Sequence, residues 1–290
     1  MVVCNFVVAG VGGFASGTVW SCPWWGELAS MTTPKKRLVG ELVRRELRQR
    51  YLGSLSGGAW ALLQPLAQLA IYGYVFGRIF SARLPQQEFG ELAFLAFLAI
   101  GLWPWNAFAE SLSRACTTIT DNAGLLGKVA IPRFLLVLAP VAAAFMLQVA
   151  GFAAVLLVLY LGGWFEPRWQ ALLTLPLFVL LALFTLGLAW LFSALTVFVR
   201  DIAHGLPQAL LLMFFLTPVL YPRSLVPETL LPLADANPLA LFVGLFRQSV
   251  LGVGSYGPGD WLLAVVLTLA SLAAGYLVFQ RLAPHFEDFQ

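Results

Sequence analysis

Charged residues are scarce in this chain. Only 11% of its 290 residues are Asp, Glu, Lys or Arg, whereas 60% are apolar. A soluble domain carries about a quarter of its residues as charges, which coat its surface. A chain of this composition cannot cover itself with polar groups, so lipid must be most of its solvent. This scarcity excludes an ordinary soluble globular protein.

Cysteine and histidine are also rare. The three cysteines, Cys4, Cys22 and Cys116, show neither CxxC nor metal-ligand spacing. Two of them lie near the N-terminus and the third is expected to face the cytosol, which argues against a structural disulfide. His204 and His285 are isolated. We therefore expect no metal site and no cofactor held by this chain.

A nucleotide-binding motif is missing as well. Gly124 and the Gly127–Lys128 pair suggest a P-loop, which requires GxxxxGK followed by Ser or Thr. The sequence has Asn122 and Val129 at the positions that decide the match, so it fails. Clustered Asp, His or Ser beside the apolar runs, which a membrane-embedded enzyme needs, are not found either. We expect no catalytic residues in this chain.

Long apolar runs are what the sequence has instead. A helix needs about 20 apolar residues to cross about 30 Å of hydrocarbon. We predict an all-α polytopic membrane protein in which residues 59–281 form six transmembrane helices and residues 282–290 a cytosolic tail. The expected spans are Ala59–Phe80, Leu92–Leu112, Phe134–Leu161, Ala171–Val199, Leu206–Tyr221 and Trp261–Gln280. The third, fourth and sixth contain no acidic residue, which disfavours a secondary transporter with carboxylates at the midplane.

The basic residues predict the orientation. With a cytosolic N-terminus, the inner segments hold the seven Lys and Arg residues of 35–50 together with Arg114, Lys128, Arg133, Arg200 and Arg281. The outer segments hold Arg78, Arg83, Arg168, Arg223 and Arg247. The positive-inside rule therefore places both termini in the cytosol. Trp164 and Trp169 flank one of the outer loops, where amphipathic rings prefer to lie.

The first thirty-three residues read as an N-terminal extension. Its start, MVVCNFVVAGVGGFASGTVW, is apolar and rich in glycine but has no positive region before it, so it is a poor signal peptide. Met31 begins MTTPKKRLVGEL, a more ordinary start. One interpretation is that the native protein begins at Met31. The alternative is a loosely ordered interfacial segment.

Residues 34–58 predict a basic amphipathic helix and its junction with the first span. Apolar residues recur every four positions at Val39, Val43, Leu47 and Tyr51. The basic side chains Arg44, Arg45 and Arg48 fall on the other side. Such a helix lies at the membrane surface, held by apolar burial and by anionic lipid. A simple anchor that sets the topology remains the alternative.

Three segments resemble, in the right order, the type-2 ABC exporter permeases that move O-antigen, capsule or teichoic-acid polysaccharides. Glu41–Leu66 resembles the family's interface helix and first span, and Gly101–Arg133 its second span and following cytosolic loop. Thr217–Gly252 resembles its outer re-entrant helices. The resemblance covers roughly residues 35–285. It implies a membrane subunit that works with a separate ATPase chain, which would bind the ATP and Mg.

The resemblance gives a role to the cytosolic loop 121–133. From spacing alone this is a connecting loop with an apolar face. In the family it is the coupling helix that docks on the ATPase. The residues implied in this role are Asp121, Leu125, Leu126, Lys128, Val129 and Arg133.

The outer segment 222–259 holds two apolar pieces, Leu225–Leu233 and Leu239–Leu251, that are too short to span. In the family such pieces form an outer gate that dips into the membrane. Arg247 and Glu228 are charged residues near membrane depth, where such residues face a cavity or a partner.

Aromatic residues crowd the second span. We predict that Phe97, Trp103, Trp105 and Phe108 contact the glycan, because sugar rings stack on aromatic rings through their C–H faces. Helix packing or an interfacial belt is the alternative for each ring. Glu110 and Arg114 form an i,i+4 pair that supports the helix.

The predicted function is that of the membrane-spanning subunit of an ATP-driven exporter of a lipid-linked polysaccharide in the cytoplasmic membrane. The alternative is a permease of the same architecture for a small hydrophobic drug or lipid. The expected partners are an ATPase subunit, a second copy of the chain, the lipid-linked polymer and membrane lipids, and no nucleic acid is expected.

Overall fold

The computed structural model describes residues 33–51, 59–75, 91–126, 132–163, 166 and 168–288. Its contacts divide the chain into two compact units, Met1–Leu38 and Val39–Gln290. All regular secondary structure in the described residues is helical. The predicted all-α class is therefore confirmed. The second unit carries the helices discussed below, including α2 (Thr33–Tyr51) from Val39 onward.

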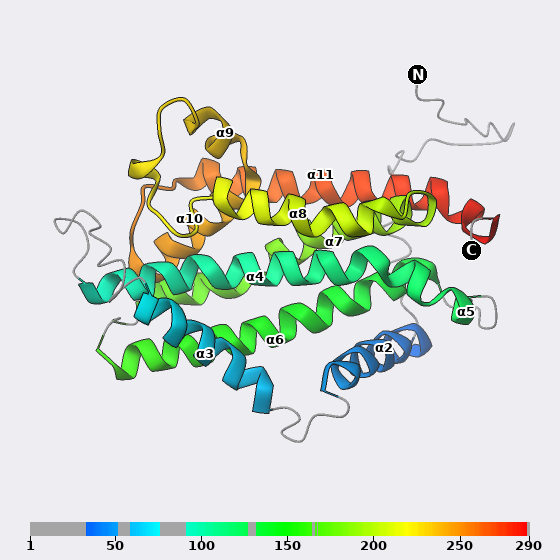
Figure 1. Cartoon of the computed structure of the whole chain (residues 1–290), viewed down its shortest axis with the longest axis horizontal. Helices are drawn as coiled ribbons and strands as arrows, with labels where there is room; N and C mark the ends of the chain where they lie inside the picture. Colours follow the sequence, from blue (N-terminus) through cyan, green and yellow to red (C-terminus); the bar gives the residue numbers. More distant parts are fainter. Residues whose placement is uncertain are drawn as a thin grey trace, which may run out of the picture. The chain divides into compact units, whose positions relative to one another are not determined.

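Each of the six predicted spans coincides with a helix (Figure 1). These helices are α3 (Trp60–Tyr74), α4 (Glu91–Asp121), α6 (Arg133–Leu161), α7 (Thr174–Phe198, preceded by the 3₁₀ turn η3, Trp169–Leu173), α8 (Asp201–Leu216) and α11 (Pro258–Leu282). Three described stretches are long and apolar enough to cross a membrane: Arg133–Leu161, Trp169–Phe198 and Pro258–Phe286. The chain is therefore a polytopic helical membrane protein.

Three of the predicted span ends that fall in the described residues differ from the observed ones by at least five residues. One is the end of the fifth span, at Leu216 rather than Tyr221. The second span ends at Asp121 rather than Leu112. Polar residues near its end bond to the helix's own carbonyls, as Thr118 Oγ1 does to Arg114 O at 2.9 Å, so they do not interrupt it. The fifth begins at Asp201 rather than Leu206, because a carboxylate is favourable in the first turn of a helix.

The core of the second unit lies where α7 packs against α4 and α11. Gly187 of α7 and Gly275 of α11 face each other, and a Cβ at either position would overlap the backbone of the other helix. Small residues let helix backbones approach closely where lipid gives no hydrophobic driving force. Ser271 Oγ reinforces the contact by donating to Phe184 O at 2.9 Å.

The segment between α8 and α11 holds a 3₁₀ turn, η4 (Arg223–Leu225), and two short helices, α9 (Leu231–Ala236) and α10 (Pro238–Leu251). The second predicted apolar piece corresponds to α10. The first differs, because the chain forms turns up to Leu230 and α9 starts only at Leu231. α10 packs on α4 and α7 and buries Phe242 and Phe246 almost completely.

The remaining helices are α2 (Thr33–Tyr51), α5 (Ala123–Leu126) and the 3₁₀ turn η5 (Ala283–Asp288). α2 buries Leu42 and Val43. Arg44, Arg45 and Arg48 are exposed, so α2 has an apolar and a basic face.

Candidate functional site

A cleft of about 400 Å³ opens between α3, α4 and α8. Its lining includes aromatic rings from all three helices, Tyr72, Trp105 and Phe214. It also includes polar side chains of α4, with Asn106, Glu110 and Ser113 at the i, i+4 and i+7 positions that share a helix face. The remaining lining residues are Leu102, Ala109, Pro207, Leu210 and Leu211. A lining of flat apolar rings and hydrogen-bonding groups suits a ligand that has both faces and hydroxyls.

Packing fixes the aromatic lining. Trp105 is only 5% exposed, and its ring centroid lies 5.9 Å from that of Phe108 and 5.5 Å from that of Phe214. Asn106 Nδ2 donates to Gln68 Oε1 on α3 at 3.2 Å. These contacts hold α3 and α8 against α4 on either side of the cleft.

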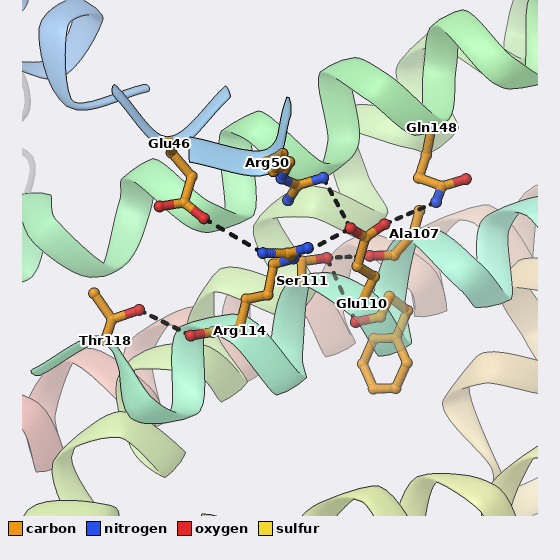
Figure 2. A network of polar contacts seen from close by, with 9 residues as sticks. Glu46, Arg50, Ala107, Glu110, Ser111, Arg114, Thr118 and Gln148 are labelled. Atoms are coloured by element: carbon orange, nitrogen blue, oxygen red, sulfur yellow. Dashed lines mark hydrogen bonds and ion pairs between the residues drawn. The ribbon is translucent and has the colours of Figure 1, made fainter. Parts of the chain in front are cut away.

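A charged network adjoins the cleft and joins three helices through Glu110 (Figure 2). Glu110 Oε1 accepts from Arg50 Nη1 of α2 at 2.8 Å and from Arg114 Nε at 3.2 Å. Its second oxygen accepts from Gln148 Nε2 of α6 at 2.9 Å. Arg114 also lies 3.8 Å from Glu46 of α2.

Burial makes this network more than a surface ion pair. The Arg50 side chain is 5% exposed and that of Glu110 is 30% exposed. Exposed pairs contribute about 0–1 kcal/mol, whereas removing one partner of a buried pair is strongly destabilising. The two arginines and two glutamates also balance in charge. The network therefore fastens the C-terminal end of α2 to α4 and α6.

Of the predicted residues on α2, Arg45 contacts the turn between α4 and α5, since its Nη2 donates to Asn122 Oδ1 at 3.2 Å. Arg44 and Arg48 are exposed. Sequence reasoning did not single out Arg50, although a signal was available. Arg50 lies seven positions after Val43, hence on the buried face of α2, with the acidic residue Glu46 one turn before it.

The predicted coupling residues are only partly described. Asp121 is exposed at the end of α4, and Leu125 and Leu126 are the last two residues of α5. Lys128 and Val129 lie outside the described residues.

Arg133, the last predicted coupling residue, begins α6 and contacts the C-terminal segment. Its Nη1 donates to Ala283 O, and its guanidinium lies 5.8 Å from the ring centroid of Phe286. The start of α6 is thereby attached to η5.

The four predicted glycan contacts do not converge on one place. Trp105 lines the cleft. Phe108 is 2% exposed and stacks on Phe184 of α7 at 6.3 Å between centroids. Trp103 is 1% exposed and lies against Gly151 of α6. Phe97 lies beneath the guanidinium of Arg247, 3.5 Å from the ring centroid. That these rings contact a glycan stays a prediction.

No three His, Cys, Asp or Glu side chains in the described part of the chain are grouped closely enough to hold a metal ion. The expectation that this chain carries no cofactor stays a prediction.

A bundle of apolar helices that holds a cleft and an ion-pair network between them is a polytopic helical membrane protein. The ABC-2 type transporter family model matches residues 37–251, and the chain belongs to that family. The family identifies it as the membrane subunit of an ABC transporter, whose ATPase is a separate partner.

Relatives extend the comparison. The O-antigen export system permease protein RfbA of Klebsiella pneumoniae is 26% identical over 251 residues, 85% of this chain and 92% of that protein. RfbA of Myxococcus xanthus is 34% identical over 193 residues, 66% of this chain and 70% of that protein. The polysialic acid transport protein KpsM of Escherichia coli is 26% identical over 247 residues, 85% of this chain and 93% of that protein.

Proposed function

We propose that this chain is the membrane-spanning subunit of an ATP-driven exporter of a lipid-linked polysaccharide across the cytoplasmic membrane. The observation that carries the proposal is its similarity, over 85% of its length, to permeases named for O-antigen export and for polysialic acid transport. Both names denote polymers of sugars. The shared cargo class is therefore a polysaccharide, of O-antigen, capsular or teichoic-acid type.

The chemistry of the α3–α4–α8 cleft supports this cargo. The rings of Tyr72, Trp105 and Phe214 offer flat apolar surfaces on which the C–H faces of sugars stack. Asn106 and Ser113 offer hydrogen bonds to the hydroxyls. Many weak contacts of this kind hold a polymer without fixing its register, which sliding requires.

We further propose that two copies of the chain form the transport channel. The apolar residues of α8 beside the cleft are exposed in the single chain: Leu211 is 55% exposed, Leu212 63% and Phe215 56%. One chain supplies one coupling loop, and one open cleft is half of an enclosed path. A second copy facing the first would close the cleft into a channel.

The contacts of α2 support a route by which ATP hydrolysis is coupled to the cleft. The ATPase subunit holds the nucleotide and Mg and closes on α5 and its neighbours, Asp121–Arg133. Arg45 bonds to Asn122 beside α5, and Arg50 of the same helix bonds to Glu110 at the cleft. A displacement of α5 is therefore passed along α2 to the cleft wall. This scheme requires both termini in the cytosol, where the ATPase is, as the basic residues predict.

The test is to delete the gene for this chain in its own host and then to restore the gene on a plasmid. We expect the polymer to disappear from the cell surface and to accumulate inside the cell in its lipid-linked form, and to return to the surface on complementation. Unchanged surface polymer, with increased sensitivity to small hydrophobic compounds, would instead favour the drug or lipid permease.

A further inference from the structure

A second and larger cavity, of about 760 Å³, lies where α9, α10 and the start of α11 meet α4. It shares no lining residue with the α3–α4–α8 cleft. In Figure 1 this end of α4 is opposite the end that leads to α5. Its volume falls in the range of small-molecule sites, about 300–1,000 Å³. The residues that give it chemical character are Phe97, Arg223, Asp235, Arg247, Tyr256 and Asp260.

The floor of this cavity is built around Arg247, which is 6% exposed. Its guanidinium donates to Pro218 O at 2.6 Å, to Val219 O at 2.5 Å and to Phe97 O at 3.3 Å. Gly101 allows this approach, since a Cβ there would lie 2.5 Å from Nη2 of Arg247. These bonds fix the loop after α8 onto α4, so the floor is rigid before any ligand arrives.

The wall is formed by Tyr256, whose position two glycines determine. Gly252 and Gly254 have φ of 71° and 104°, a region that favours glycine. The turn directs the phenol over Gly244 of α10, where any Cβ would overlap the hydroxyl. Gln248 Nε2 donates to Tyr256 O at 2.9 Å. Burial raises the pKa of the Tyr256 phenol, which therefore stays a neutral donor and acceptor.

The charges at the rim are already matched. Arg223 Nη2 lies 2.6 Å from Asp235 Oδ2. Asp260 Oδ2 accepts from the backbone N–H of Gly257 at the start of α11. Two arginines and two aspartates line the cavity, so it has no excess charge to select a free anion. The hydroxyls of Ser224 and Ser255 also line the cavity. An acyl chain bound there would offer these hydroxyls no hydrogen-bond partner, which costs free energy.

An aromatic ring held in place by packing, neutral hydroxyls and one ion pair that satisfies its own charges are chemistry that suits sugars. We propose that this cavity is a saccharide-binding subsite, separate from the cleft, which holds a short stretch of the polymer as it leaves the protein. Tyr256 stacks on a sugar ring, and Arg223, Asp235 and Ser255 bond to its hydroxyls. The inference rests on the proposed function, because it takes the exported polymer as the ligand.

Photo-crosslinking tests contact directly. A benzophenone amino acid replaces Ser255 inside the cavity or, as a control, Tyr160 on the exposed face of α6, in cells that make radiolabelled polymer. We expect light-dependent transfer of label to the Ser255 variant at least fivefold above the Tyr160 variant. Equal labelling of the two, or capture of phospholipid alone at position 255, would overturn the proposal.

Substitutions then test whether the contact matters for export. Tyr256→Leu removes the ring, and we expect the export rate to fall three- to tenfold. Tyr256→Phe keeps the ring and should retain at least half of the rate, while Tyr160→Leu should have no effect. Equal rates for Tyr256→Leu and wild type, in a strain that exports its polymer normally, would refute the subsite and leave the proposed function standing. A wild-type protein that exports no polysaccharide would refute the proposed function itself.

Discussion

Glu110 is the residue on which the described polar contacts near the cleft converge. Its pairing with Arg114 was predicted from the i,i+4 spacing and is confirmed at 3.2 Å. The structure adds Arg50 and Gln148, so a helix-supporting pair becomes a junction of three helices. A carboxylate that both lines the cleft and holds α2 relates the position of α2 to the shape of the cleft.

The first prediction concerns this junction. Glu110→Gln keeps the size of the side chain but removes the charge that Arg50 and Arg114 share. Because hydrogen bonds to charged groups contribute about 1.5–3 kcal/mol, we expect a loss of roughly 1–3 kcal/mol. Thermal unfolding of the purified protein measures it, with Asp121→Asn as the exposed control. The double variant Arg50→Met/Glu110→Gln tests whether the two residues are coupled. If its loss of stability equals the sum of the losses of the two single variants, they are not coupled.

The second prediction separates two of the aromatic rings. Trp105 lines the cleft, whereas Phe108 stacks between α4 and α7. Trp105→Leu should therefore slow export severalfold, at a cost in stability of about 1–3 kcal/mol, since it loses two ring contacts worth about 0.5–1.5 kcal/mol each. Phe108→Leu should lower the melting temperature more than it lowers export. Export rates at matched protein levels, with melting curves, give the comparison. Wild-type export by Trp105→Leu would assign that ring to packing.

Residue types at the site could be predicted from the sequence, but their partners could not. Arg50 and Glu110 are 60 residues apart, and no local spacing relates them. Arg247 was predicted to face a cavity or partner, and it does line a cavity. The guanidinium of Arg247 is bound by carbonyl oxygens rather than by a carboxylate. These carbonyls belong to the loop after α8, and the sequence pattern does not specify the course of that loop.

The helices themselves were more predictable than their ends. Apolar periodicity and length identify a span because lipid requires every backbone group to be bonded within the helix. Ends depend on polar side chains that bond locally, which is why α4 continues to Asp121. Pro104 lies inside α4, which is continuous through it. Helix packing, as at Gly187 and Gly275, is not visible in hydropathy.

The third prediction tests that packing with matched glycines. Gly→Ala in a helix interior ordinarily stabilises by up to about 1 kcal/mol. Gly205 of α8 has open space around its Cβ position, so Gly205→Ala should follow this rule. A Cβ at Gly275 would meet the carbonyl of Gly187, so Gly275→Ala should destabilise by roughly 1–3 kcal/mol. Melting temperatures that rise for both variants would show that α7 and α11 separate easily.

The fourth prediction concerns α5. If Leu125 and Leu126 enter a groove on the ATPase, changing both to Asp should abolish export and leave membrane insertion intact. Charged side chains in an apolar groove lose hydration without gaining partners. Co-purification of the ATPase subunit measures docking, and Arg281→Gln in the last turn of α11 serves as an exposed polar control outside the coupling segment. Normal export by the double variant would remove this helix from the coupling mechanism.

For the whole molecule, the orientation in the membrane is the property on which the other assignments depend. The proposed docking of the ATPase on α5 and the exit of polymer near α10 require opposite sides of the membrane. The basic residues predict that the C-terminal segment η5 and the start of α6 are cytosolic, and Arg133 attaches the one to the other. The turn before η3 should then face outward.

The fifth prediction tests this orientation with single cysteines in a cysteine-free variant. Glu166 and His285 are exposed, whereas the neighbouring Phe286 is 1% exposed and would label poorly on either side. Intact cells should react with a membrane-impermeant thiol reagent at Glu166→Cys and not at His285→Cys. Permeabilised cells should label both, which shows that each thiol is reactive. Labelling of His285→Cys alone in intact cells would show the opposite orientation. α5 would then lie outside the cell, away from any cytosolic ATPase. That result would contradict both the coupling scheme and the proposed exit side of the polymer.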